Sequence, residues 1–388
     1  MAFPDKPIAH LLGSNGPVNA VSYSASPGTY ILTGSSDRTI RLYNPASSSN
    51  TSSTSSSSSS SYITGKATAP TPELPQGRLI QTYAAHGYEV LSLRVSHDNA
   101  RFVSGGGDRS VFLWDVSTAQ TLRRFGGNAA SHSARINAVC FGGDDDALVV
   151  SGSLDATVRV WDTRNNSSFK PVQTLADAKD AVTSVVVVRD SAEIVAGSVD
   201  GRVRSYDVRM GRCLTDVVSP GHGVTSLCAT RDGKALLVGS LDSKVRLMDR
   251  ESGGCLKTYA DPALRNAELR VQSILGGKEQ YVLAGDEMTG SGTGTGTEAG
   301  TATTNPGGQK NGEGRVWAWD VMTGEVKAKI RVPWGPTGSE PRKKLIGKDG
   351  KEKERSNIIS CLAWREEGFG DQYCVGGTSG TVTVFGYH

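Results

Sequence analysis

Short segments in which apolar and polar residues alternate recur along the whole chain. VFLWD at residues 111–115 and VRVWD at residues 158–162 are examples, and a period of two is typical of a β-strand with one buried face. A Gly-rich turn that contains Asp precedes each of them, and another apolar strand precedes that turn. Further short strands flank this pair, such as INAVCF ahead of it and PVQTL behind it. The pattern predicts units of four strands, and no segment of the chain favours a helix.

This four-strand unit is repeated. Five copies are clear, and they are ILTGSSDRTIRLYN (31–44), FVSGGGDRSVFLWD (102–115), VVSGSLDATVRVWD (149–162), IVAGSVDGRVRSYD (194–207) and LLVGSLDSKVRLMD (236–249). Two degenerate copies end at Asp320 and Gly386. The closing acids Asp115, Asp162, Asp207 and Asp249 lie 47, 45 and 42 residues apart, close to the period of about 40–45 residues of a four-stranded propeller blade. We therefore expect an all-β, seven-bladed β-propeller that occupies residues 1–388 as one domain.

The two ends of the chain suggest how the ring closes. The last unit supplies three strands, whereas a spare apolar strand, PIAHLL at residues 7–12, precedes the first unit. If this spare strand pairs with the last unit, every blade has four strands and an exposed sheet edge is removed. The sequence thus predicts a ring closed by an N-terminal strand.

Three low-complexity segments interrupt the repeat. They are Ser-rich at about 46–77, Gly/Thr-rich at about 287–313 and charged at about 334–356. Such compositions bury too little apolar area to offset the entropy of ordering. We expect loop insertions in an otherwise regular propeller.

The charge of the chain is nearly balanced outside one loop. The chain holds 42 Lys and Arg against 39 Asp and Glu, a net charge of +3. Residues 341–355 alone hold seven basic and three acidic side chains, so the rest of the chain carries no broad basic surface for nucleic acid. A solvated loop and a segment that targets the nucleus or contacts RNA both remain open for this stretch.

Candidate chemistry is sparse. The six cysteines form no CxxC pair, so no metal site is indicated, and we interpret them as small buried residues in a reducing compartment. The turn Asp recurs in most units, which favours a structural role over catalysis. The GSGTGTG segment follows no strand-to-helix turn, which argues against a nucleotide site. MAFPDKPIAH lacks the apolar run of a secretory signal. We expect a non-enzymatic protein without a cofactor or a membrane span, working in the cytoplasm and the nucleus.

The Trp-Asp endings, with Gly-Ser-x-Asp turns upstream of them, resemble the WD-repeat family of β-propellers. In that family a His before the first strand, a Ser or Thr in the second, the turn Asp and the Trp hydrogen-bond within a blade. The resemblance implies two such tetrads, His86, Ser104, Asp108 and Trp114 in the second unit and His132, Ser151, Asp155 and Trp161 in the third. Other units depart from the pattern. The fifth keeps His222 and Asp242 but has Met248, the fourth has Tyr206, and the last has Ser379. We expect packing, more than a buried polar network, to hold those blades together.

Segments of units two to five resemble a narrower group, the mitogen-activated protein kinase organizers. These segments are HGYEV, SGGGDRSVFLWDV, PVQTLADAKDAVTSV, AGSVDGRVRSYDVRMG and LDSKVRLMD. The resemblance implies a scaffold for kinase-cascade components in a family also associated with spliceosomes. Its partners would be proteins, namely kinase-cascade components or splicing factors, bound by a monomeric propeller within larger complexes. A propeller that binds RNA directly through basic loops is the alternative.

The loops at one end of the ring are the place to expect a partner. Residues just before the first strand of each unit and just before the turn Asp should share that end. Leu154, Val199 and Leu241 would form an apolar core there with a charged rim, as in a protein interface, although they could also simply cap the blades. The candidate partner face consists of Glu89, Arg135, Leu154, Lys179, Val199, Leu241 and Arg270.

Overall fold

The computed structural model describes residues 3–46, 74–126, 131–165, 170–188, 193–208, 210–287, 313–336, 339, 345–346, 352–353, 356–365 and 370–387. Most of the three predicted insertions at 46–77, 287–313 and 334–356 lie outside these residues. Part of the third is described, and there β26 (Leu345–Ile346) and β27 (Glu352–Lys353) pair as a short antiparallel hairpin. The charged composition of that segment does not predict this pairing.

Seven four-stranded antiparallel sheets account for the other strands of the described residues. Blade 1 has β2 (Val18–Tyr23), β3 (Ile31–Ser35), β4 (Ile40–Asn44) and β5 (Arg78–Tyr83). Blade 2 has β6 (Val90–Val95), β7 (Arg101–Gly106), β8 (Val111–Asp115) and β9 (Thr121–Phe125). Blade 3 has β10 (Ile136–Gly142), β11 (Leu148–Ser153), β12 (Val158–Asp162) and β13 (Gln173–Leu175), with a 3₁₀ turn at Asp144–Asp146. Blade 4 has β14 (Val182–Val188), β15 (Glu193–Ser198), β16 (Arg202–Asp207) and β17 (Arg212–Val217).

The remaining three blades follow the same order. Blade 5 has β18 (Val224–Ala229), β19 (Ala235–Ser240), β20 (Lys244–Asp249) and β21 (Cys255–Tyr259). Blade 6 has β22 (Ser273–Gly276), β23 (Tyr281–Gly285), β24 (Gly314–Asp320) and β25 (Val326–Val332). Blade 7 has β28 (Ile359–Trp364), β29 (Gln372–Gly377) and β30 (Val382–Gly386), and its fourth strand is β1 (Lys6–Leu11).

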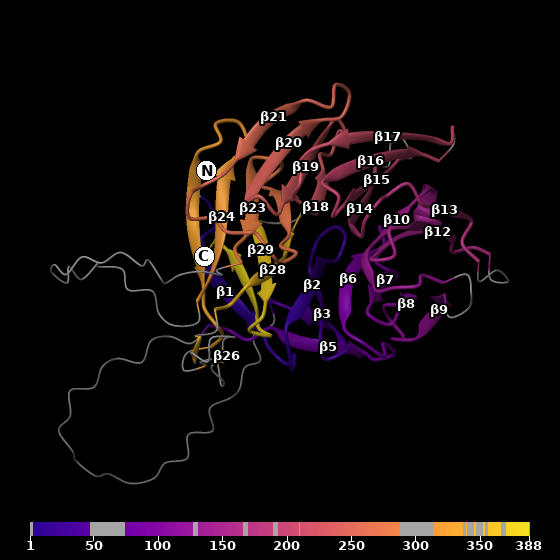
Figure 1. Cartoon of the computed structure of the whole chain (residues 1–388). Helices are drawn as coiled ribbons and strands as arrows, with labels where there is room; N and C mark the ends of the chain where they lie inside the picture. Colours follow the sequence, from indigo (N-terminus) through magenta and orange to yellow (C-terminus); the bar gives the residue numbers. More distant parts are fainter. Residues whose placement is uncertain are drawn as a thin grey trace, which may run out of the picture.

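The blades form a closed ring (Figure 1). The first strand of each blade contacts the first strands of both neighbouring blades, in the cycle β2, β6, β10, β14, β18, β22, β28 and back to β2. β1 pairs antiparallel with β30, with His10 opposite Thr383 and Leu11 opposite Val382. The all-β seven-bladed propeller and its closure by an N-terminal strand are both confirmed.

Burial explains why the pattern of the repeat folds in this way. The second strand of a blade is almost entirely buried, as in β7, whereas the outermost strand, as in β9, is mostly exposed. The glycine of the second strand lets the next blade approach. A Cβ on Gly105 would lie 2.7 Å from Ile136 Cγ2, and one on Gly152 would lie 2.6 Å from Val182 Cγ1. Two of the glycines that recur in the repeat are therefore required for packing between blades.

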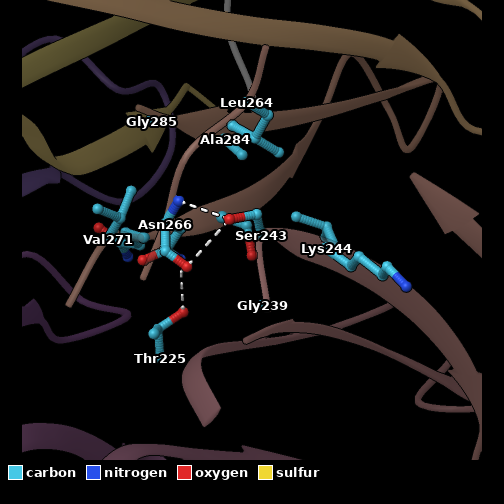
Figure 2. Close-up of a pocket in the computed structure, with 12 residues that line it drawn as sticks. Thr225, Gly239, Ser243, Lys244, Leu264, Asn266, Val271, Ala284 and Gly285 are labelled. Carbon is cyan, nitrogen blue, oxygen red and sulfur yellow. Dashed lines mark hydrogen bonds between the residues drawn. The ribbon is translucent and has the colours of Figure 1, made fainter. Parts of the chain in front are cut away.

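Polar side chains on the first strands connect one blade to the next. Asn19 donates to the Val90 carbonyl, Asn137 to the Val182 carbonyl, and Thr183 to the Val224 carbonyl. Each of these residues lies where the register of its strand shifts, so the extra residue of the bulge turns toward the neighbouring blade. Blades 5 and 6 are connected differently, through the loop before β22. Figure 2 shows Asn266 of that loop, whose amide side chain donates to Thr225 Oγ1 over 3.4 Å.

Candidate functional site

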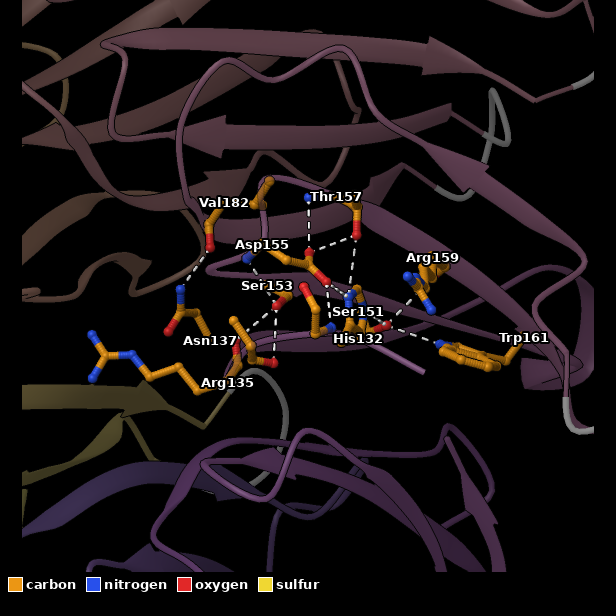
Figure 3. Close-up of polar contacts among 12 residues, drawn as sticks. His132, Arg135, Asn137, Ser151, Ser153, Asp155, Thr157, Arg159, Trp161 and Val182 are labelled. Carbon is orange, nitrogen blue, oxygen red and sulfur yellow. Dashed lines mark hydrogen bonds and ion pairs between the residues drawn. The ribbon is translucent and has the colours of Figure 1, made fainter. Parts of the chain in front are cut away.

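The two predicted tetrads are assembled in blades 2 and 3. In blade 2, His86 Nδ1 lies 2.7 Å from Asp108 Oδ2 and Nε2 lies 2.6 Å from Ser104 Oγ, while Trp114 Nε1 donates to the same Oγ over 2.8 Å. Blade 3 repeats this arrangement with His132, Ser151, Asp155 and Trp161, at 2.9, 2.8 and 2.9 Å (Figure 3). Each tetrad joins the loop before the first strand to the second and third strands, so it fixes the loops at one end of the ring.

The electrostatics of the blade 3 tetrad follow from its burial. Burial alone would raise the pKa of Asp155, but hydrogen bonds from His132 and Thr157 outweigh burial and hold that pKa well below its usual value. Burial lowers the pKa of His132, although the nearby Asp155 carboxylate acts in the opposite direction. The imidazole is therefore neutral at neutral pH. The tetrad is a set of hydrogen bonds that holds the loop before the first strand against the second and third strands. The structure contains no reason to assign it a catalytic role.

Blades 1, 4 and 5 hold the turn Asp with an arginine instead of a histidine. The guanidinium comes from the third strand, four residues after the Asp. Arg41 Nη2 lies 2.8 Å from Asp37 Oδ2, Arg204 Nη2 lies 2.6 Å from Asp200 Oδ2, and Arg246 pairs in the same way with Asp242. Arg204 and Arg246 also donate to Ser198 and Ser240 of the second strand.

These pairs correct two expectations. Blades 4 and 5 do contain a buried polar network, since Arg204 is only 2% exposed and is fully engaged by Asp200 and Ser198. His222 does not take part, because it is exposed and its Nδ1 lies 3.3 Å from the Pro220 carbonyl. In the sequence, these three pairs correspond to the spacing Asp-x-x-x-Arg, in DRTIR, DGRVR and DSKVR. We did not predict them, because we considered only histidine as the partner of the turn Asp.

Blades 6 and 7 use still other groups. In blade 6 the Glu287 carboxylate accepts from the backbone amides of Ala267 and Glu268, and Trp317 Nε1 donates to Asp286 over 2.9 Å. Ala284 stands where blade 2 has Ser104, so Trp319 Nε1 is buried without a partner among the described residues. In blade 7, Ser379 N donates to Asn357 Oδ1. All of these contacts serve to hold loops at the same end of the ring.

The candidate partner face lies at this end. The amides of Gly107, Leu154, Val199 and Leu241 donate to the carbonyls of Glu89, Arg135, Ala181 and Gly223, which sets one side chain per blade beside the channel. Leu154 is 45% exposed and Val199 38% exposed, while Leu241 is half-buried. Lys179 is exposed and its amide donates to Asp200, and Glu89 is half-buried. An apolar arc of Leu154, Val199 and Leu241 thus occupies three consecutive blades.

Arg135 and Arg270 lie at the same end of the ring as the apolar arc, on the side of the central channel. Both line the central channel, and Arg270 Nη1 donates to the Asn137 carbonyl of blade 3. Figure 3 shows the Arg135 side chain pointing away from the His132 tetrad. These arginines are therefore not the outer rim of the apolar arc. Their direction could not be read from the sequence, because it depends on which residues face them across the ring.

One space between two blades is too small for a ligand. The space beside Asn266 between blades 5 and 6 has a volume of about 10 Å³, which is the size of a single water at most. Across the described ranges, no three His, Cys, Asp or Glu residues gather as they would around a metal ion. None of the helices in the described residues is both long and apolar enough to span a bilayer. All six cysteines are free thiols; Cys140, Cys361 and Cys374 are buried as expected, but Cys213 and Cys255 are exposed.

Two family models match the chain. The WD domain, G-beta repeat, matches residues 5–44 and 77–115, and the nucleolar protein 10-like N-terminal domain matches residues 120–272. Neither match extends beyond residue 272, so the strands of blade 6 and the last three strands of the chain, which belong to blade 7, lie outside both; their repeats are also the most degenerate in the sequence.

Curated relatives match parts of the chain. The WD repeat domain-containing protein 83 homolog of Dictyostelium discoideum is 33% identical over 177 residues, 46% of this chain and 43% of the relative. A guanine nucleotide-binding protein subunit beta of Zea mays is 34% identical over 29% of each chain. Human DDB1- and CUL4-associated factor 5 is 26% identical over 45% of this chain and 16% of its own length. The chain thus spans less than half the length of these relatives. Seven four-stranded blades close into a ring and WD repeats match residues 5–44 and 77–115, so the chain is a β-propeller that contains WD repeats.

Proposed function

We propose that this protein is a non-enzymatic scaffold that gathers proteins of a mitogen-activated protein kinase cascade or of a splicing assembly, in the cytoplasm and the nucleus. The apolar arc of Leu154, Val199 and Leu241 is the observation that carries the proposal. Two of its three side chains are more than a third exposed, on loops held by the Asp155, Asp200 and Asp242 networks. Exposed apolar side chains on a rigid frame favour association with another protein, because their burial is favourable and little ordering is required.

The comparisons support the general part of this proposal. Two of the relatives, a guanine nucleotide-binding protein subunit and a DDB1- and CUL4-associated factor, are named for their association with other proteins. The narrower part rests on the resemblance of segments in blades 2 to 5 to the kinase organizers. The apolar arc lies in blades 3, 4 and 5, within that region of resemblance.

Affinity purification tests the proposal. The tagged protein would be purified from cells of its source after nuclease treatment, so that RNA does not bridge proteins, and the co-purified proteins would be quantified by mass spectrometry. We expect kinase-cascade components or splicing factors with the natural protein. The triple change Leu154→Ser, Val199→Ser and Leu241→Ser should reduce their recovery at least about tenfold, since it removes the apolar core of the face.

A matched control distinguishes the face from exposed apolar residues in general. Leu122, Leu214 and Leu256 are 53%, 66% and 59% exposed on the outer strands β9, β17 and β21, away from the turns that carry the arc. Their replacement by Ser should leave recovery unchanged. Equal recovery with the arc variant, or recovery of neither class of protein, would contradict the proposal.

A further inference from the structure

The central channel holds positive charge without a counter-charge. A cavity of about 360 Å³ lies along the axis of the ring, and residues of all seven blades line it. Its charged lining residues are Arg94, Arg135 and Arg270, and no carboxylate is among the lining residues that the structure describes. The rest of the lining is mostly hydroxyl, amide and small apolar side chains. An uncompensated group of arginines in a narrow cavity attracts anions, because the low-dielectric walls concentrate the field.

Arg270 and Arg135 lie together at the mouth of the channel. Arg270 precedes the first strand of blade 6 and reaches across the mouth of the channel, where its Nη1 donates to the Asn137 carbonyl of blade 3 over 2.5 Å. Arg135 lies two residues before Asn137, so two guanidinium groups share the mouth. More than a third of Arg270 is exposed to solvent, yet the channel walls around its guanidinium and the positive charge of Arg135 lower its pKa to about 10, which still leaves it charged at neutral pH.

These arginines have no acidic partner in the described part of the chain. Among the described residues, the arginines that form ion pairs are Arg41, Arg164, Arg204, Arg246, Arg250 and Arg315, and none of them is a channel arginine. A guanidinium carries five N–H donors, and one acceptor is recorded for Arg270. Two like charges held together in this way favour a ligand that neutralises them.

Arg94 adds a third charge deeper in the channel. It lies on β6 four residues after Val90, and Val90 is at the mouth end of that strand, opposite Gly106. At about 3.3 Å per residue, Arg94 is roughly 13 Å from the mouth along the strand. A ligand that carries charged groups at more than one position suits this arrangement, because the three arginines start from two levels of the channel.

Hydroxyl groups between the two levels add further donors. Ser92 Oγ accepts from the Val139 amide, and Ser184 Oγ accepts from the Leu227 amide. A hydroxyl that accepts one hydrogen bond still has its own proton to donate. The channel therefore has hydroxyl donors along its wall, between the two arginines at its mouth and Arg94 further inside.

We propose that the central channel is a binding site for a compact anion that carries several phosphate groups. One phosphate group would bind between Arg135 and Arg270, and another would approach Arg94. Phosphate suits this site because the planar guanidinium donates two parallel hydrogen bonds to its oxygens. The cavity volume is in the range of a small-molecule site, which is too small for a folded protein. This site is separate from the apolar arc and does not depend on the function proposed for it.

Isothermal titration calorimetry of the full chain at low salt tests the proposal. Inositol hexakisphosphate, ATP and inorganic pyrophosphate would be titrated separately, which distinguishes a phosphorylated ring, a nucleotide and a simple phosphate chain. We expect saturable binding of at least one of them with one site per chain. Arg270→Gln, Arg135→Gln and Arg94→Gln should each weaken that binding about tenfold or more, since each removes a charge-assisted contact.

Arg212→Gln is the matched control, because Arg212 is exposed on the outer strand β17. It should leave the affinity unchanged. Without ligand, Arg270→Gln should melt at or above the temperature of the natural protein, since the substitution relieves repulsion from Arg135. If one variant fails to fold, the other two still report on the site. No saturable binding of any of the three anions, or equal weakening by Arg212→Gln, would overturn the proposal.

Discussion

At the residue scale, the feature common to most blades is a carboxylate at the turn between the second and third strands, and its partner varies. The partner is a histidine in blades 2 and 3, where His86 contacts Asp108 and His132 contacts Asp155. It is an arginine in blades 1, 4 and 5, namely Arg41, Arg204 and Arg246. A largely buried carboxylate needs a hydrogen-bonded partner, and either side chain provides one. The histidine tetrads could be predicted from spacing. The arginine pairs share the spacing Asp-x-x-x-Arg, but blade 3 has this spacing too, in Asp155 and Arg159, and there the Asp pairs with His132. The spacing therefore shows that a pair is possible and does not decide which partner the Asp takes.

Replacing Asp155 with alanine should destabilise the protein by about 1–3 kcal/mol, because His132, Thr157 and the Ser133 amide all lose an acceptor. The free energy of unfolding in urea measures this change. Asp177→Ala is the control, since Asp177 is exposed on the loop before blade 4. A loss below about 0.5 kcal/mol for Asp155→Ala would show that the tetrad contributes little to that blade.

At the element scale, the strands and their order could be predicted because each one has a clear period and a bounding turn. The position of β1 followed from counting strands, since a three-stranded last blade would leave an edge exposed. Two features could not be predicted in this way. The bulges that turn Asn19 and Asn137 toward the next blade have no local marker, and the β26–β27 hairpin lies in a segment with a solvated composition.

Removal of residues 1–12 should lower the midpoint of thermal unfolding of the whole domain and promote association between molecules. The deletion exposes the edge of β30 and removes Ala9 and Leu11, which are 1% and 2% exposed. In the full chain, Leu11→Ser should lower the midpoint, whereas Lys6→Ser, on the exposed end of β1, should not. An unchanged midpoint for the deletion would mean that the ring does not need its fourth strand in blade 7.

At the scale of the whole molecule, several turn carboxylates act together on stability. The pKa of Asp37 and that of Asp200 are each lowered to about 2, and those of Asp155 and Asp242 are lowered as well. Burial opposes each shift, and hydrogen bonds from the partner side chains outweigh it. These carboxylates stabilise the ring only when ionised.

The stability of the protein should therefore fall as the pH drops from about 4 to about 2. A group whose pKa is lower in the folded state than in the unfolded chain binds protons on unfolding, so its contribution is present above the unfolded value near 3.9 and is lost below it. Urea midpoints between pH 2 and 6 measure the slope. Asp200→Asn should make the slope shallower, and Asp177→Asn should not. A slope that is unchanged in Asp200→Asn would contradict the role of its pair with Arg204.

The sequence alone determined the architecture of this protein, because strand period, turn residues and repeat length are local properties that recur in each copy of the repeat. It also located the apolar arc, since equivalent positions in successive repeats occupy equivalent places in the ring. Only the tertiary structure decided that Arg94, Arg135 and Arg270 line the same channel. The three arginines belong to three different blades and have no common spacing in the chain. In addition, the direction of a long side chain depends on the residues that face it across the channel. The charged channel is thus a product of ring closure, and no single repeat contains it.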